Sequence, residues 1–451
     1  MNRRSFLTLS GAAALDLASG PISPLALEAL GAAVKPDYTI RIAPVSVELA
    51  PTTLIRTTGY NGKVPGPIIR MREGRRVTIE VRNDTDVPEL VHWHGQVVSS
   101  DVDGAEEEST PLIPPHGRRQ YSFTPRPAGT RWYHTHAMAG ADINRSTYTG
   151  QYGFFIVEPS SEPGNYDQEI FLAARHWEPS IALRGRWRVD YKSASLGERM
   201  LGHGEPIRVR QGQRALFHIL NADASETHRV SLPGHRFQVV ALDGNPVPTP
   251  ATVEMIQVGI GERVDAIVEM NNPGVWVLGS IADDDRNKGL GVVVEYSGQK
   301  GEPRWMPPAD ANWDYTIFAS QTKTEIPEPD GRFEMSFVML PNGDKPFNMW
   351  TINDKSWPDT EPLLVKQGRR YRLVYRNGKD DAHPMHLHRH NVEIISIAGK
   401  PTAGLMKDVV QVRPNQTVEV DFLADNPGPS LLHCHNQMHM DFGFKTLVKY
   451  V

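Results

Sequence analysis

The chain repeats one unit three times, at a spacing close to the size of a domain. The first element of the unit is a turn glycine followed by a strand pattern that ends at asparagine. Its copies begin at Glu73, Gln211 and Gln367, roughly 140 to 160 residues apart. A second element, a glycine-containing turn that enters another strand, recurs in the same order. Because self-similarity at a fixed period means that one structural unit recurs, the repeat predicts three similar domains.

The sequence between the repeated elements alternates apolar and polar residues, as half-buried strands do, and long amphipathic helical patterns are scarce. The clearest predicted strands are residues 38–49, 152–157, 207–220, 237–242, 263–270, 392–397 and 417–423. With 38 glycines and 36 prolines, the chain has the turn content that many short strands require. We therefore predict an all-β protein of three β-sandwich domains, at residues 36–159, 160–300 and 301–451.

Arg3 and Arg4 resemble the start of a twin-arginine (Tat) export signal, and a short apolar stretch follows at residues 7–17. That stretch is too short to be a stable membrane anchor. We expect residues 1–35 to be a Tat-type signal segment that engages the Tat export machinery, and the protein to be periplasmic or otherwise exported. An ordinary basic N-terminus is the alternative. The net charge of −5 gives no reason to expect nucleic acid or an anionic membrane as a partner.

Four His-x-His pairs carry the most specific chemistry of the sequence. They are His92/His94, His134/His136, His386/His388 and His433/His435. The pairs occupy matching places in the first and third copies of the repeat, whereas the second copy has Val230, Leu232, Gly279 and Ile281 there. Side chains two apart in a strand share a face, so each pair can reach two adjacent metal ions. Eight imidazoles without an accompanying acidic cluster favour copper over calcium or magnesium.

Cys434 is the only cysteine of the chain, and it lies between His433 and His435. Because alternate side chains of a strand face opposite ways, Cys434 points away from the side that its two neighbours share. With His383 and His439 it offers two imidazoles and one thiolate, which matches the His2Cys site of blue copper proteins. Zinc would fit one His-x-His pair, but it does not change redox state and cannot exploit this arrangement. The tripeptide therefore predicts two metal centres joined by a few covalent bonds.

Four motifs of the chain resemble the copper signatures of the multicopper oxidases, in particular the three-domain, laccase-like bacterial enzymes. They are His92-Trp93-His94-Gly95, His134-Thr135-His136, His383-Pro384-Met385-His386-Leu387-His388 and His433-Cys434-His435. The resemblance covers about residues 38–451. It implies three cupredoxin-like Greek-key β-sandwich domains and four copper ions, of which one is type 1, one is type 2 and two are type 3. It also implies that a small-molecule reducing substrate is oxidised one electron at a time while dioxygen is reduced to water.

Carried over residue by residue, the resemblance assigns the type 1 copper to His383, Cys434 and His439, and the type 2 copper to His92 and His386. The type 3 pair would be held by His94, His134, His136, His388, His433 and His435. The cluster of three coppers would then lie between domains one and three, with domain two as a spacer without copper ligands. Electrons would pass from Cys434 to His433 or His435. Asp103 would be the proton donor, with an ordinary turn residue as the alternative.

Two positions depart from the family pattern. Phe444 stands where the family often has the axial methionine of the type 1 copper, which predicts a site of higher potential. Met440 stands where many bacterial relatives have an acidic residue, and this leaves the proton route at that position open.

The donor substrate is the least determined feature. Phenols and aromatic amines are the leading prediction. A cuprous-ion oxidase in copper tolerance is the alternative, because that role tends to come with methionines beside the type 1 copper, and Met438 and Met440 flank His439. A copper-free exported scaffold and a copper nitrite reductase are further alternatives. The complete ligand sets argue against the scaffold, and the paired His-x-His motifs exceed what the mononuclear second site of a nitrite reductase needs.

Overall fold

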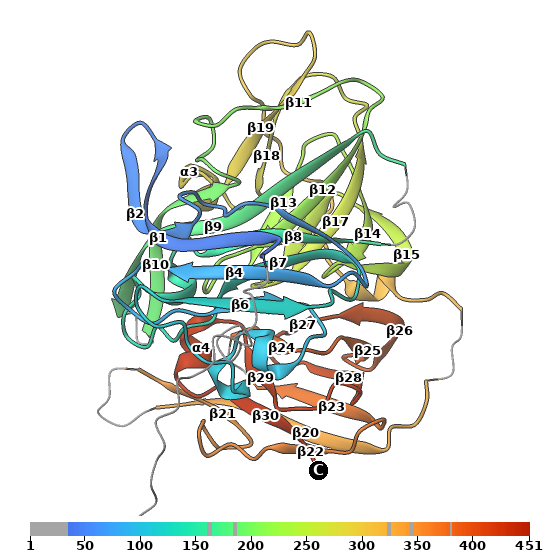
Figure 1. The fold of residues 1–451 in the computed structure, drawn as a ribbon. Helices are drawn as coiled ribbons and strands as arrows, with labels where there is room; N and C mark the ends of the chain where they lie inside the picture. Colours follow the sequence, from blue (N-terminus) through green and yellow to red (C-terminus); the bar gives the residue numbers. More distant parts are fainter. Residues whose placement is uncertain (1–34, 160–164, 184–186, 323–325, 342–346, 379–380) are drawn as a thin grey trace, which may run out of the picture. The chain divides into compact units, whose positions relative to one another are not determined.

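The computed structural model describes residues 35–451, apart from 160–164, 184–186, 323–325, 342–346 and 379–380. In this part the chain is mostly strands, gathered into six sheets (Figure 1). The α-helices of this part are short: α2 (Ser100–Asp103), α3 (Asp283–Asn287) and α4 (Gln437–Asp441). The prediction of an all-β fold is confirmed. The predicted signal segment lies, except for Lys35, outside the described residues. No helix of the described part is long and apolar enough to cross a membrane.

The first sheet pair is formed by the N-terminal strands of the described chain. One sheet has the order β2-β1-β4-β6, with β1 (Tyr38–Ala50), β2 (Thr53–Tyr60), β4 (Val77–Asn83) and β6 (Arg118–Phe123). The other has the order β3-β8-β7-β5, with β3 (Ile69–Arg72), β5 (Val91–His94), β7 (Gly129–Thr135) and β8 (Tyr152–Glu158). Ile79, Val81, Trp93, Tyr133 and Phe155 are buried together in the core between them.

The second sheet pair follows in the sequence. Its larger sheet has the order β10-β9-β12-β17-β14-β15, with β9 (Gln168–Leu183), β10 (Trp187–Leu196), β12 (Arg214–Asn221), β14 (Phe237–Leu242), β15 (Asn245–Val253) and β17 (Arg263–Glu269). The smaller has the order β11-β19-β18-β13-β16, with β11 (Ile207–Val209), β13 (His228–Ser231), β16 (Met255–Val258), β18 (Val275–Ser280) and β19 (Gly291–Tyr296).

The third sheet pair ends the chain. Its larger sheet has the order β21-β20-β23-β28-β25-β26, with β20 (Gly331–Leu340), β21 (Met349–Ile352), β23 (Arg370–Asn377), β25 (Val392–Ile397), β26 (Lys400–Lys407) and β28 (Thr417–Leu423). The smaller has the order β22-β30-β29-β24-β27, with β22 (Leu363–Val365), β24 (His383–Leu387), β27 (Val409–Val412), β29 (Ser430–Cys434) and β30 (Lys445–Tyr450). The division of the chain into domains after residues 159 and 300 stays a prediction.

The sequence repeat has a structural cause that recurs in all three sheet pairs. The repeated glycines Gly74, Gly212 and Gly368 have φ of 74°, 79° and 78°, a left-handed conformation that glycine adopts without strain. The strands that follow are β4, β12 and β23, and each ends at the repeated asparagine. The asparagine side-chain amides donate to the carbonyls of Ile113, Val258 and Val412, respectively, at 2.9–3.1 Å. The repeat therefore encodes a turn, a central strand and a hydrogen bond from the end of that strand, which in the second and third pairs reaches the other sheet.

The prediction of a single strand over residues 207–220 is wrong. The segment forms β11 and β12, which lie in different sheets and are separated by the turn at Gly212. Val209 of β11 and Ala215 and Phe217 of β12 are all buried in the same core. Both strands direct apolar residues toward that core. The alternation of apolar and polar residues therefore continues through the turn, and the sequence pattern does not reveal where one strand ends and the next begins.

A fully buried charge cluster connects the three sheet pairs. Asp408, between β26 and β27, accepts two hydrogen bonds from Arg263 of β17, each of 2.6 Å, and one of 3.2 Å from Arg131 of β7. The Lys407 ammonium lies 2.9 Å from the carboxylate of Asp243. Two-point contact between a guanidinium and a carboxylate is the strongest form of such a pair, and it fixes direction as well as distance. One carboxylate thus fixes the positions of strands from all three pairs.

Replacing Arg263 by Ala is expected to lower the free energy of unfolding by about 3–5 kcal/mol, because Asp408 would stay buried with half of its partners removed. The matched control is Arg376→Ala, since the pair of Arg376 with Glu334 is 2.9 Å long but about half exposed on both sides. That change should cost about 1 kcal/mol or less. Chemical denaturation of both variants measures the difference, and equal midpoints would contradict the assigned role of the cluster.

A second buried contact between the first and second sheet pairs makes stability depend on pH. His218 of β12 lies 2.9 Å from Asp265 of β17, and Asp265 also accepts a 2.8 Å hydrogen bond from Thr130 of β7. Burial alone would lower the pKa of His218, but Asp265 and Glu169 outweigh it and raise the pKa to about 9. The folded protein therefore holds a proton on His218 that the unfolded chain releases near pH 6.5.

This contact should contribute its full stabilisation below about pH 6.5 and lose it as the pH rises through about 9, a loss on the order of 3 kcal/mol. The His218→Gln variant should therefore lose stability less steeply than the wild type between pH 6.5 and 9. Urea denaturation at several pH values measures both slopes. Parallel slopes would show that His218 does not carry the additional proton.

Candidate metal centre

Strand pairing brings the four His-x-His pairs together two by two. In the first sheet pair, β5 runs antiparallel to β7 with His92 opposite His134. In the third sheet pair, β24 runs antiparallel to β29 with His386 opposite His433. Of the other members, His94 lies on β5, whereas His136, His388 and His435 come directly after the last residues of β7, β24 and β29. The strand geometry expected from the sequence therefore places four histidines on, or at the ends of, paired strands in each of two sheets.

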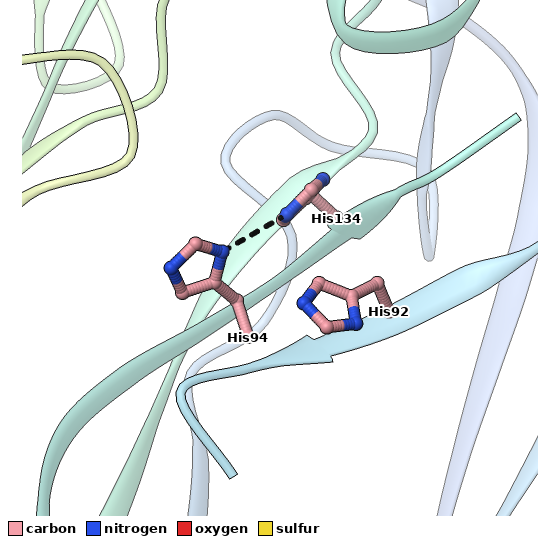
Figure 2. A group of neighbouring side chains, drawn as sticks. All are labelled: His92, His94 and His134. Atoms are coloured by element: carbon pink, nitrogen blue, oxygen red, sulfur yellow. Dashed lines mark hydrogen bonds between the residues drawn. The ribbon is translucent and has the colours of Figure 1, made fainter. Parts of the chain in front are cut away.

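The two sets of histidines meet at the contact between the first and third sheet pairs. The Nε2 atoms of His92 and His386 lie 3.4 Å apart, although the residues are 294 positions apart in the chain. Figure 2 shows His94 Nδ1 directed at His134 Nε2, at 3.4 Å, with His92 beside them on β5. On the other side of the cluster, the Nε2 atoms of His388 and His433 are 3.0 Å apart. The eight imidazoles thus converge on one small volume, which we call the eight-histidine cluster.

Hydrogen bonds fix which ring nitrogen faces the centre of the cluster. Nδ1 of His92, His134, His386 and His433 lies 2.7–2.9 Å from the backbone carbonyls of Asp103, Thr135, Asp408 and Cys434, respectively. A carbonyl only accepts, so Nδ1 carries the proton and Nε2 is left with a free lone pair. His94 is reversed, because its Nε2 lies 3.1 Å from Asp408 Oδ1 and its Nδ1 faces His134. Neither ring nitrogen of His435 has a hydrogen-bond partner, although the side chain is buried.

Burial keeps seven of the eight imidazoles uncharged. Each of the eight side chains is at most 6% exposed. Burial, with neighbouring imidazoles as a smaller cause, lowers the pKa of seven of the eight well below the usual histidine value, to about 3 for His435. Neutral imidazoles with converging lone pairs form a donor set for a cation, and nitrogen donors suit copper better than calcium or magnesium.

A second group of possible metal ligands surrounds Cys434, on the side of β29 opposite the eight-histidine cluster. Its Sγ lies 3.4 Å from Nδ1 of His439 and 3.9 Å from Nδ1 of His383, and these two nitrogens are 3.3 Å apart. Burial raises the pKa of the Cys434 thiol far above its usual range and lowers the pKa of His383 to about 3. A metal cation would therefore displace the thiol proton on binding. The three donors match the His2Cys set of a blue copper site.

Aromatic rings pack against both histidines of this second group. The ring of Phe444 packs edge-on against His383, with 4.8 Å between centroids, and Trp350 stacks on His439 at 4.3 Å. Phe444 is fully buried and offers no donor atom. Its position is the one predicted from the sequence, next to the donors but unable to act as an axial ligand.

Carboxylates contact the cluster from two sides. Oδ2 of Asp103 lies 3.1 Å from Nδ1 of His92 and 2.7 Å from Nδ1 of His388, so the Asp103 singled out in the sequence lies at the cluster. Glu108, which sequence reasoning missed, lies 3.5 Å from the same nitrogen of His388. Burial and then the charge of Asp103 raise the pKa of Glu108 well above its usual range, so this carboxyl stays protonated. Asp408 was missed as well, because neither acid belongs to a repeated motif.

The short helix α4, which carries His439, is fixed by the first sheet pair. Asp441 Oδ2 accepts hydrogen bonds from the backbone N–H groups of Ala139 and Gly140, at 3.1 and 2.8 Å, in the loop that follows His136. Gln437 donates to the other carboxylate oxygen of Asp441 at 3.0 Å. Burial raises the pKa of Asp441 to about 6. The acid next to Met440 therefore ties α4 to the loop of a histidine pair.

A cavity of about 240 Å³ opens beside His439. Asn436, Met438 and Met339 line it from the third sheet pair, and Glu226 and Thr227 from the second. A larger cavity, of about 1060 Å³, lies between the first and second sheet pairs, but none of the residues lining it is a predicted metal ligand. Of these two cavities, the smaller one therefore gives a small molecule access to a predicted metal ligand.

Comparison with known proteins identifies the family of the chain. The multicopper oxidase family matches the chain in three segments, residues 42–162, 174–295 and 333–450. The chain is 28% identical to the multicopper oxidase MmcO of Mycobacterium tuberculosis, over all of this chain and 97% of that protein. It is 25% identical to a laccase of Pycnoporus cinnabarinus, over 98% of this chain and 92% of that one.

Solved structures of similar fold belong to the same family. The multi-copper oxidase of Pseudomonas thermotolerans superimposes with a TM-score of 0.73 and 25% identity, covering 92% of this chain and 98% of that one. Fet3p, a multicopper oxidase that functions in iron import, gives a TM-score of 0.78 and 20% identity, covering 92% and 90%. The prediction of a cupredoxin-like fold is confirmed.

Proposed function

The chain belongs to the multicopper oxidase family, and we propose that it removes electrons singly from phenols or aromatic amines and delivers them to dioxygen. That it is a copper-dependent oxidoreductase follows from the family. The observation that carries the finer proposal is the convergence of two separate donor groups on opposite sides of one strand. They are the three donors around Cys434 and the eight-histidine cluster.

We propose four copper ions in the arrangement implied by the sequence. His383, Cys434 and His439 would hold type 1 copper, and His92 and His386 type 2 copper. The type 3 pair would be held by two trios, His94/His134/His435 and His136/His388/His433; the second of these has donor atoms within 4.8 Å of one another. Bound copper would supply the one-electron redox steps and the place of dioxygen reduction.

Of the two type 1 histidines, a reducing substrate can contact only the one that borders a cavity. His439 lines the 240 Å³ cavity, which we call the donor cavity, and His383 does not. That volume is below the roughly 300–1,000 Å³ of sites for drug-sized ligands, so it suits a single-ring compound or an ion. An electron entering at His439 would pass along the Cys434 side chain and the backbone bonds that join its Cα to the Cα of the adjacent residue, and so reach His433 or His435.

Asp103 is the proposed source of protons. Its Oδ2 accepts from Nδ1 of His388 and lies 3.1 Å from Nδ1 of His92, so a proton held there would lie one ring away from the centre of the cluster. Protonated Glu108 lies beside Asp103 and can return a proton to it. Because the cluster side chains are buried, acids in contact with them are suited to deliver protons.

Export through the twin-arginine pathway to the periplasm is also proposed. It rests on Arg3, Arg4 and the short apolar stretch at residues 7–17, which lie outside the described residues.

Copper quantitation with a visible spectrum tests the proposal. The copper-loaded wild type should contain about four coppers per chain, absorb in the blue-copper band and consume oxygen with a phenolic donor. Cys434→Ser should lose the band and donor oxidation together, because serine removes the thiolate, while keeping about three coppers in the eight-histidine cluster. A Ser variant that still oxidised the phenol would contradict the electron route. Colourless, inactive wild type with full copper would contradict the function itself.

A second candidate, oxidation of cuprous ion, is favoured by two methionines. Met339 and Met438 line the cavity beside His439, and thioether sulfur is a ligand that Cu(I) prefers. Glu226 and Asp381 add carboxylates to the same lining. A soft donor pair at the cavity is what a metal-ion substrate would need.

Replacing Met339 and Met438 by Leu keeps their volume and removes their sulfur. If Cu(I) is the substrate, its kcat/KM should fall about tenfold or more while phenol oxidation changes less than about twofold. Met440→Leu is the matched control, because Met440 lies on the same helix and is not part of the lining. Equal kinetics of the double variant and the wild type with Cu(I) would leave organic donors as the substrates.

A further inference from the structure

The second sheet pair holds none of the predicted copper ligands, yet it carries a buried polar cluster next to the donor cavity. Asp223 lies at its centre, 1% exposed, in the loop between β12 and β13. The residue follows Asn221 by two positions, and its backbone N–H donates to the Asn221 side chain at 2.9 Å. In the first sheet pair, Thr85 makes the same bond to Asn83 at 3.0 Å. The position two residues after the repeated asparagine is thus shared by the copies of the repeat. In the second copy it holds a carboxylate, which can accept further hydrogen bonds.

One oxygen of Asp223 organises the loop that follows. Oδ1 accepts hydrogen bonds from the backbone N–H groups of Ser225 and Glu226, at 3.1 and 3.3 Å. An aspartate that bonds the backbone two residues on closes an Asx turn, which fixes the start of a loop. The hydroxyl of Ser225 lies 2.8 Å from that of Tyr191, which holds the turn from the side of β10.

The other oxygen of Asp223 is held by two histidines. Oδ2 accepts from the backbone N–H and from Nδ1 of His176, at 2.8 and 2.9 Å, and lies 3.3 Å from Nε2 of His228. Although burial opposes it, Asp223 and Asp285 raise the pKa of His176 to about 9, so the bond to Asp223 is charge-assisted. The carboxylate is therefore anchored to β9 on one side and holds the loop on the other.

The loop fixed in this way forms a wall of the donor cavity. Ser225, Glu226 and Thr227 line the cavity together with His439. The carbonyl of Ala224 accepts a 3.0 Å hydrogen bond from the backbone N–H of Gln437, the first residue of α4. A shift of this loop would therefore change the shape of the cavity and the support of the helix that carries His439.

Resting on the proposed function, we propose that Asp223 is a positioning residue for donor binding: by fixing residues 224–227, it makes the second sheet pair a determinant of which donors reach His439. The alternative is that Asp223 only stabilises the fold. The two roles differ in what they change. A positioning role alters the KM of a donor that must enter the cavity and leaves unaffected a donor that does not, whereas a purely structural role affects all donors and copper content together.

The experiment compares Asp223→Ala and Asp223→Asn with the matched control Asp285→Asn. Asp285 lies 3.4 Å from Nε2 of the same His176 and does not line the cavity. Donors are a dimethoxyphenol, which must enter the cavity, and ferrocyanide, which gives up an electron without close fit. For Asp223→Ala we expect the phenol KM to rise about tenfold, with kcat within about twofold. Ferrocyanide turnover, copper content and the visible band should stay at wild-type values. Asp223→Asn, which keeps the acceptor oxygen for the loop, should show a smaller rise.

Three results would overturn the proposal. An unchanged phenol KM in Asp223→Ala would show that the loop does not need the carboxylate. A parallel fall with both donors, together with loss of copper, would assign Asp223 to stability alone. The same KM change in Asp285→Asn would transfer the effect to His176. Failure of the proposed function is a separate result, because the copper-loaded wild type would then oxidise neither donor.

Discussion

Asp408 places a carboxylate where the three sheet pairs meet, and the rest of the structure depends on its neutralisation there. Arg263 of the second pair and Arg131 of the first both donate to it, and all three side chains are fully buried. A buried charge without partners costs several kcal/mol, so the three pairs are stable together only in the arrangement that satisfies Asp408. The backbone carbonyl of Asp408 accepts from His386 and its side chain contacts His94. The contact that fixes the domains therefore also fixes two histidines of the cluster.

Burial lowers the charge of the two donor groups. Seven of the eight cluster imidazoles are neutral because burial penalises their protonated form, and the Cys434 thiol keeps its proton for the same reason. The Nδ1 protons of several rings are held by backbone carbonyls, so the free lone pairs are aimed before any metal arrives. A neutral, pre-oriented donor set reduces the rearrangement that binding of copper would require.

The sequence predicted the site well where the site follows strand period, and poorly where it depends on contacts distant along the chain. His92 and His94, or His433 and His435, share a face because strands alternate, and this needs no knowledge of the tertiary fold. Asp408 and Glu108 could not be found in this way. Glu108 ends a run of three glutamates that reads as a solvated surface, yet only Glu106 of that run is exposed. The boundary between β11 and β12 was missed for a related reason, since alternation toward one core conceals the turn between two sheets.

The repeat explains how one domain without ligands can still govern the chemistry of the other two. In the first and third copies, the strand after the repeated asparagine carries a histidine pair, and the two copies together close the cluster. In the second copy those places hold apolar residues, and the loop before them carries Asp223 in their stead. The same second pair supplies Arg263 to the buried charge cluster and residues 225–227 to the donor cavity. The middle copy holds no predicted copper ligand, but it helps to fix the orientation of the other two copies and the shape of the donor cavity. It therefore acts as more than a spacer.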